Sequence, residues 1–189
     1  MNKTYIGYGV GALVIVVVFF VWVMGWYPVV EVNGSLVLAR EYRMQFRIAY
    51  SYYHADGFTA LLDSQEEDIT AVQDDVIAER VMESVIDATL IDTYLSSTLP
   101  DYGDMLQENA LTLSRDEVLS EYVTYLSQMA DVSADVIEQY FFVDRVRYQL
   151  LEEQLGEEAA DWLVDARAHA VVTMFYPKFA WDDGLVHVQ

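Results

Sequence analysis

The longest feature of the hydrophobic pattern is an unbroken apolar run near the start of the chain. No charged residue occurs in 4–25, and a helix of these 22 residues spans the roughly 30 Å hydrocarbon core of a bilayer. We therefore predict a transmembrane anchor there. A cleaved signal peptide is the alternative, but its apolar region is usually shorter, and Trp26 and Tyr27 are typical of a membrane interface. Lys3 places the N-terminus in the cytoplasm by the positive-inside rule.

Two short runs rich in β-branched and aliphatic residues follow the apolar segment. Val29–Val32 and Ser35–Leu38 flank the dipeptide Asn33-Gly34. This dipeptide favours positive φ angles at both central positions of a type I′ turn, so Val32, Asn33 and Gly34 form the turn motif of a predicted β-hairpin. Two strands of this length are only marginally stable alone, so the hairpin needs a further strand.

Helical periodicity dominates the rest of the chain. Tyr42, Phe46, Tyr50 and Tyr53 line one face of a first helix and are expected to be core residues. Serines at 64, 114 and 133, each with an acidic residue two or three positions later, are typical helix starts, and Gly156 is a typical helix end. The predicted helices cover 39–54, about 30 residues from position 64, 114–129, 133–155 and 157–170.

The β-branched run VVTMF at 171–175 predicts a closing strand. The predicted fold class is therefore mainly α, with an N-terminal transmembrane helix followed by one five-helix domain over 29–189. This domain would also contain a small β-sheet.

Charge narrows the classes of partner. The chain has 31 acidic and 10 basic residues, a formal net charge of −21. Nucleic acid is excluded as a partner, since its phosphates need clustered Lys and Arg, and broad adhesion to an anionic membrane surface is disfavoured. The chain has no cysteine, which excludes disulfides, thiolate metal sites and a cysteine nucleophile.

The acidic residues do not form a recognisable metal site, and no cofactor or metal is predicted. Asp161, Asp165 and His169 share one helical face, where they would need a further ligand to hold a divalent ion. A solvated helix face is the simpler interpretation. Asp182-Asp183-Gly184 lacks the alternating ligand positions of an EF-hand loop.

The predicted helix over 133–155 has more apolar surface than one buried stripe requires. Phe142, Val146 and Leu150 form one stripe, which is expected to face the core. A second group either lines a groove or adds core or subunit contact, and it consists of Tyr140, Phe141, Tyr148, Leu151 and Leu155. These five are the candidate site residues.

Two further patterns bear on the membrane. Arg40, Arg43 and Arg47 follow the predicted anchor closely, where they either contact lipid headgroups or, as the excess of carboxylates favours, form surface ion pairs. Gly7 and Gly11 form a G-x-x-x-G pattern within the anchor, which favours a homodimer.

The segment VVEVNGSLVLAREYRMQF resembles the opening of the SurA N-terminal domain family, in which a short hairpin leads directly into the first helix. AERVMESVIDATLIDTYL resembles that family's long second helix, and WLVDARAHAVVTMFYPKFAW resembles its closing helix and strand. The resemblance implies a periplasmic or cell-surface foldase or chaperone module whose final strand pairs with the opening hairpin. The parvulin prolyl isomerase domain of many relatives has no counterpart in this sequence.

These patterns lead to one functional expectation and one alternative. We expect a single-pass membrane protein with its domain in the periplasm or outside the cell, which binds unfolded or extended segments of exported polypeptides in an apolar, helix-lined groove without catalysis. The alternative is a structural or adaptor subunit of a membrane complex. A groove that tolerates many peptides should be rich in Met and aromatic side chains, whereas a fixed interface should be a flat apolar patch with a polar rim.

Overall fold

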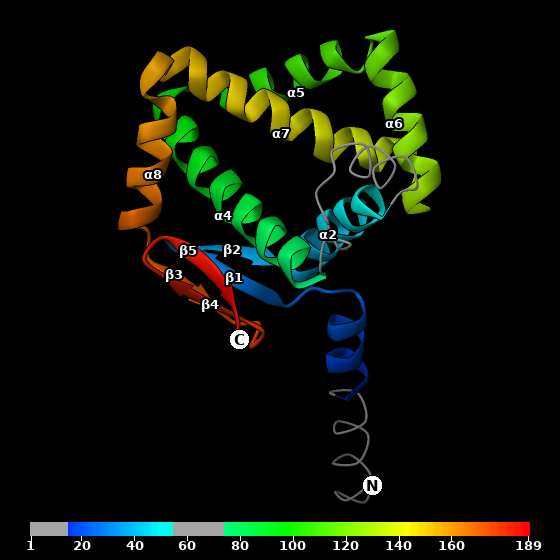
Figure 1. Cartoon of the computed structure of the whole chain (residues 1–189), viewed down its shortest axis with the longest axis vertical. Coiled ribbons are helices and arrows are strands. Elements are labelled where there is room, and N and C mark those ends of the chain that lie inside the picture. The colour runs from blue at the N-terminus through cyan, green and yellow to red at the C-terminus, as the bar shows by residue number, and fades with distance from the viewer. Residues whose placement is uncertain (1–14, 55–73) are drawn as a thin grey trace, which may run out of the picture.

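The structure is a computed structural model that describes residues 15–54 and 74–189, and it is mainly helical (Figure 1). Residues 15–23 form a helix that leads into β1 (Pro28–Val32) and β2 (Ser35–Leu38). The helices that follow are α2 (Ala39–Tyr53), α4 (described from Asp74–Thr98), α5 (Tyr102–Leu113), α6 (Glu117–Ala130), α7 (Ala134–Leu155) and α8 (Ala159–His169), with a short 3-10 turn, η1 (Gly156–Glu158), before α8. The chain closes with β3 (Val172–Met174), β4 (Phe179–Asp182) and β5 (Leu185–Val188).

The predicted three-stranded sheet is confirmed. Its strand order is β2-β1-β3 and all pairs are antiparallel, so the central strand is the first one after the apolar helix. Val30 lies opposite Met174, and Val32 lies opposite Val172. Asn33 and Gly34 have φ angles of 50° and 87°, as the predicted type I′ turn requires.

The core is divided among three clusters of buried residues. The first joins β1, β2, α2 and the N-terminal half of α4 with Phe179 and Val186 of the C-terminal hairpin. The second joins the C-terminal half of α4 with α5, α7 and α8, and the third joins α6 with the N-terminal half of α7. α4 takes part in two clusters and is the axis of the domain. The sheets lie on the side of the helices from which residues 15–23 leave the domain (Figure 1).

Two elements of the domain were not predicted. α5 follows the Leu99-Pro100 break, where the sequence was interpreted as a loop. β4 and β5 form a hairpin whose turn is Asp183-Gly184, with φ angles of 49° and 81°. Asp-Gly is a strong turn signal, which was considered only as a metal ligand pattern.

One predicted helix boundary needs correction. Ser114 ends α5 instead of starting α6, whose first turn is capped by Asp116 through a 3.1 Å bond from the Leu119 N–H to its Oδ1 atom. Ser133 precedes α7 as predicted but makes no capping bond with its side chain, and Gly156 ends that helix with a φ of 60°. The predicted helix start at position 64 lies outside the described residues.

The predicted anchor over 4–25 is described only from residue 15. The helix at 15–23 exposes a continuous apolar surface that includes Val16, Phe19 and Trp22. Among the residues that the structure describes, no helix is both long enough and apolar enough to cross a bilayer.

Candidate functional site

A cavity of about 570 Å³ lies where α2, α4, α6 and α7 meet. This volume is typical of cavities that hold small ligands or a few side chains. The lining is largely aromatic and aliphatic, and its apolar members are Ile48, Ala49, Tyr52, Tyr53, Val81, Tyr122, Leu126, Ile137, Tyr140, Phe141 and Tyr148. Such a lining in a strongly acidic protein identifies the cavity as the candidate binding site.

Three of the five candidate site residues line this cavity: Tyr140, Phe141 and Tyr148. All three are partly accessible, and Phe141 packs against Tyr122 of α6 with ring centroids 5.5 Å apart. The neighbouring Phe142 is buried in the third core cluster, as the division of α7 into two stripes predicts.

The other two candidates are placed elsewhere, in the core contact that was the alternative to a groove. Leu151 is only 2% exposed and packs against Ile91 and Leu95 of α4, while Leu155 packs on the same cluster. The stripe does not run straight along α7, because α4 and α5 cover its C-terminal half. The groove therefore ends near Tyr148.

The residues that α2 and α6 contribute were not predicted as site residues. Ile48 and Tyr52 of α2, with Tyr122 and Leu126 of α6, complete the wall opposite α7. The apolar spacing of α6 indicated a buried face, but no sequence signal indicates which other helix that face will meet. Whether the residues of α2 and α6 line the same cavity depends on the angles at which these helices cross.

Polar side chains occupy one border of the cavity. Arg80 and Arg145 bring positive charge to it, and Arg80 is paired with Glu83 at 3.3 Å. Burial raises the pKa of the Asp144 carboxyl, an effect that the Arg147 guanidinium opposes.

The Tyr148 hydroxyl is held by a buried carboxylate that also forms an ion pair. Asp87 of α4 is only 4% exposed and receives two hydrogen bonds from Arg167 of α8, one of them from Nε at 2.6 Å. The Tyr148 hydroxyl donates to the same carboxylate at 3.4 Å, and burial followed by the charge of Asp87 raises the pKa of Tyr148. One carboxylate thus connects α4, α7 and α8.

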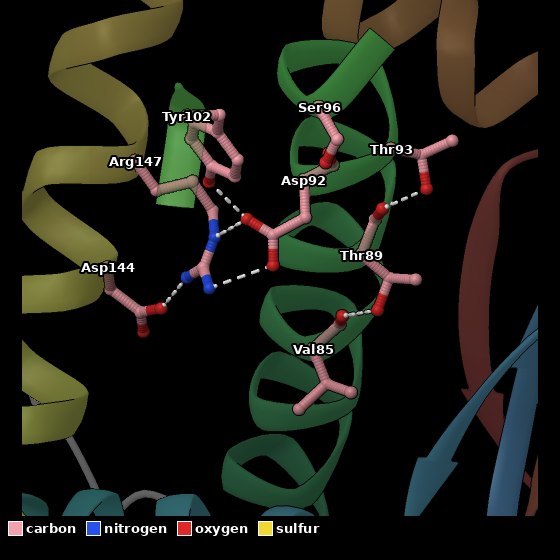
Figure 2. A network of polar contacts seen from close by, with 8 residues as sticks. All are labelled: Val85, Thr89, Asp92, Thr93, Ser96, Tyr102, Asp144 and Arg147. Atoms are coloured by element: carbon pink, nitrogen blue, oxygen red, sulfur yellow. Dashed lines mark hydrogen bonds and ion pairs between the residues drawn. The ribbon is translucent and has the colours of Figure 1, made fainter. Parts of the chain in front are cut away.

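A second network lies one helical turn further along α4 (Figure 2). Arg147 of α7 donates from Nε and Nη2 to the two oxygens of Asp92, at 2.6 and 3.0 Å. The Tyr102 hydroxyl donates to Asp92 as well, and Arg147 also bonds Asp144. Burial by itself would lower the pKa of Arg147, but Asp92 and then Asp144 raise it above its usual value.

This second network borders a smaller cavity of about 310 Å³. Gln45, Tyr140 and Asp144 line both cavities. Among the described residues, every buried side-chain polar atom has a hydrogen-bond partner. The networks therefore fix the helices that frame the apolar cavity.

The remaining sequence candidates do not extend the site. Asp165 and His169 form an exposed pair at 3.3 Å. Within residues 15–54 and 74–189, no group of three or more acidic or histidine side chains is arranged to hold a metal ion. Arg47 pairs with Asp131 at 3.2 Å, as the ion-pair interpretation predicts, whereas Arg40 lies 3.9 Å from Glu41 and Arg43 bonds the Tyr27 hydroxyl.

Comparisons with protein-family models, with curated protein sequences and with solved structures give no match to this chain. The resemblance to the SurA N-terminal domain family therefore stays a prediction, and the functional argument depends on the geometry described above.

Proposed function

We propose that this chain is a membrane-anchored, non-catalytic protein that binds extended apolar polypeptide segments outside the cytoplasm. The observation that carries the proposal is the cavity of about 570 Å³ between α2, α4, α6 and α7. Aromatic rings line it from three helices, and aromatic side chains in a concave site supply most of the binding energy of typical peptide interfaces.

The shape of the site favours a peptide groove over the adaptor alternative. A fixed partner would be matched by a flat apolar patch with a polar rim, whereas this largely apolar surface is hollowed. No methionine occurs among the described residues that line it, so adaptability to different segments would come from the aromatic rings.

Two features support the anchored location. The run 4–25 is free of charge, and the apolar side chains of its described part are exposed to the surroundings of the domain. In water such a surface would be costly, whereas hydrocarbon would accept it.

The direct test measures binding of an unfolded outer-envelope protein to the full chain in lipid nanodiscs. Suppression of aggregation is the readout. Phe141→Ser with Tyr148→Ser should weaken binding by about tenfold or more, because truncating an aromatic anchor costs at least about 1 kcal/mol. Ser84→Trp should fill the cavity from α4 and block the site without removing a core contact.

Leu111→Ser with Tyr125→Ser is the matched control, since both residues are exposed and neither lines the cavity. Circular dichroism checks that each variant is folded. If the parent protein suppresses no aggregation, or if the cavity and control variants lose it equally, the peptide-binding proposal fails and the adaptor alternative takes its place.

A further inference from the structure

The apolar helix is joined to the domain without a free linker. The helix at 15–23 passes directly into a turn in which the Trp26 N–H donates to the Val21 carbonyl at 3.0 Å. The rings of Phe20 and Trp26 meet edge to face with centroids 5.9 Å apart. The end of the helix and the first residues of the domain therefore form one structure.

The same turn is bonded to the start of α2. The Gly25 carbonyl accepts the Arg40 N–H at 3.1 Å, and the Tyr27 carbonyl accepts the Ala39 N–H at 2.8 Å. These N–H groups lie in the first turn of α2, where a helix has no partners of its own for them. The turn thus supplies the missing acceptors and fixes the direction of the apolar helix.

Gly25 makes this contact feasible. Its φ of 68° is strained for any residue with a side chain, and an added Cβ atom would lie 2.9 Å from the backbone nitrogen of Arg40. Arg43 adds a bond of 2.5 Å from its guanidinium to the Tyr27 hydroxyl. The joint between membrane helix and domain is therefore packed and hydrogen-bonded.

A set of aromatic and basic side chains surrounds this joint, and we call it the interfacial rim: Trp26, Arg40, Arg43, Phe175 and Tyr176. The three aromatic residues are 51%, 46% and 38% exposed. The backbone N–H groups of Phe175 and Tyr176 both donate to the carbonyl of Val29, three residues beyond Trp26, which places them beside the joint. Both arginines are also exposed.

We propose that the interfacial rim rests on the headgroups of anionic phospholipids and holds the domain in one orientation on the membrane. The inference depends on the proposed membrane anchor but not on peptide binding. Tryptophan and tyrosine favour the headgroup region, and arginine binds lipid phosphates. Arg43 keeps donors free for a phosphate while it bonds Tyr27, because a guanidinium has five N–H groups.

The charge distribution favours a single orientation. The chain carries a net charge of −21, so its other faces are repelled by an anionic bilayer. Glu41 lies 3.9 Å from Arg40, a distance at which an exposed pair contributes little and leaves the arginine available to lipid. Repulsion of the acidic faces and attraction at the rim act in the same direction.

The test measures the depth of single labels on the full chain in nanodiscs. Because the chain has no cysteine, Phe175→Cys can carry the sole fluorescent label, and Leu111→Cys on α5 carries the control label. Quenching by lipids with a nitroxide near the headgroup should be strong at position 175 and weak at position 111. It should be stronger with phosphatidylglycerol than with phosphatidylcholine alone.

Two changes separate the rim from the anchor. Arg40→Gln with Arg43→Gln should abolish the gain from phosphatidylglycerol, since each arginine near an anionic surface shifts binding about fivefold. Arg47→Gln with Arg115→Gln removes the same charge elsewhere and should keep the gain. A Gly-Ser-Gly insertion after Gly25 should reduce quenching at 175 while the protein still floats with vesicles.

Equal quenching at 175 and 111, or quenching unaffected by the insertion, would overturn the fixed orientation. Failure of the parent chain to float with vesicles would instead refute the membrane anchor, and with it the lipid contact. Peptide binding is measured separately, so its failure leaves this inference standing.

Discussion

Asn33 and Val171 lie 138 positions apart in the chain and exchange two hydrogen bonds of 2.9 Å. The Asn33 N–H donates to the Val171 carbonyl, and the Val171 N–H donates to Oδ1 of the Asn33 side chain. Asn33 also adopts the positive φ that the hairpin turn needs. One residue therefore shapes the first turn and holds the start of the closing strand.

Substitutions at Asn33 should separate these two roles. Asn33→Gly retains the backbone conformation but loses the side-chain acceptor, so unfolding free energy should fall by about 1 kcal/mol. Asn33→Ala should lose about 1 kcal/mol more, because alanine is strained at positive φ. Urea denaturation measures both. Asn33→Asp keeps an acceptor and tolerates this φ. If Asn33→Asp lowers the unfolding free energy as much as Asn33→Gly does, the side-chain bond contributes nothing to stability.

The Asp87 and Arg167 pair should be the most sensitive electrostatic contact of the domain. Asp87→Asn keeps the shape of the side chain but leaves the guanidinium of Arg167 without its bonded carboxylate. We expect a loss of about 3 kcal/mol in unfolding free energy, as is typical when one member of a buried pair is removed. Arg80→Gln, which breaks an exposed pair on the same helix, should cost less than about 0.5 kcal/mol. Equal costs would contradict this ranking.

The C-terminal hairpin should contribute to the core as much as the helices do. Phe179 is buried in the first cluster and meets the ring of Tyr42 at 5.9 Å. Phe179→Ala should therefore reduce unfolding free energy by about 3 to 5 kcal/mol. Leu185→Ala, at an exposed position of the same hairpin, should change it by about 0.5 kcal/mol or less. Thermal and urea denaturation measure the stability of both variants. If the two variants are almost equally stable, the hairpin contributes little to the core.

Stability should fall as pH rises above about 10. Burial raises the pKa of Tyr42 and of Tyr102, whereas tyrosines in the unfolded chain ionise near 10.0. Above that pH the folded state holds more protons than the unfolded state, so rising pH favours unfolding. Tyr42→Phe should make the loss between pH 9 and pH 11 about 1 kcal/mol smaller. An unchanged pH slope would show that Tyr42 ionises normally in the folded protein.

Prediction from the sequence was most accurate where a short sequence pattern is compatible with only one local structure. Asn33-Gly34 gave the hairpin, and the aliphatic run at 171–175 gave its third strand. Asp183-Gly184 has the same turn signal, so the hairpin of β4 and β5 was predictable from it. α5 was not predicted because Pro100 breaks the preceding helix, although Tyr102, Met105 and Leu106 begin a new apolar face.

The candidate cavity was only partly predictable for a physical reason. Periodicity on α7 shows that the helix has two apolar stripes, but the division between core and cavity depends on where other helices end. α4 and α5 cover Leu151, whereas Tyr148 lines the cavity and only its hydroxyl bonds Asp87 of α4. The buried ion pairs could not be predicted either, because Asp92 and Arg147 are 55 residues apart and no short sequence pattern links them.

The central position of β1 has a consequence for the order of folding. During synthesis β1 and β2 are complete long before β3, and a two-stranded hairpin is only marginally stable. The edge of β1 that pairs with β3 therefore stays unpaired until Val172–Met174 have been made, and closure over so long a separation in sequence is slow. Until then the nascent domain carries an open strand edge that other chains can pair with.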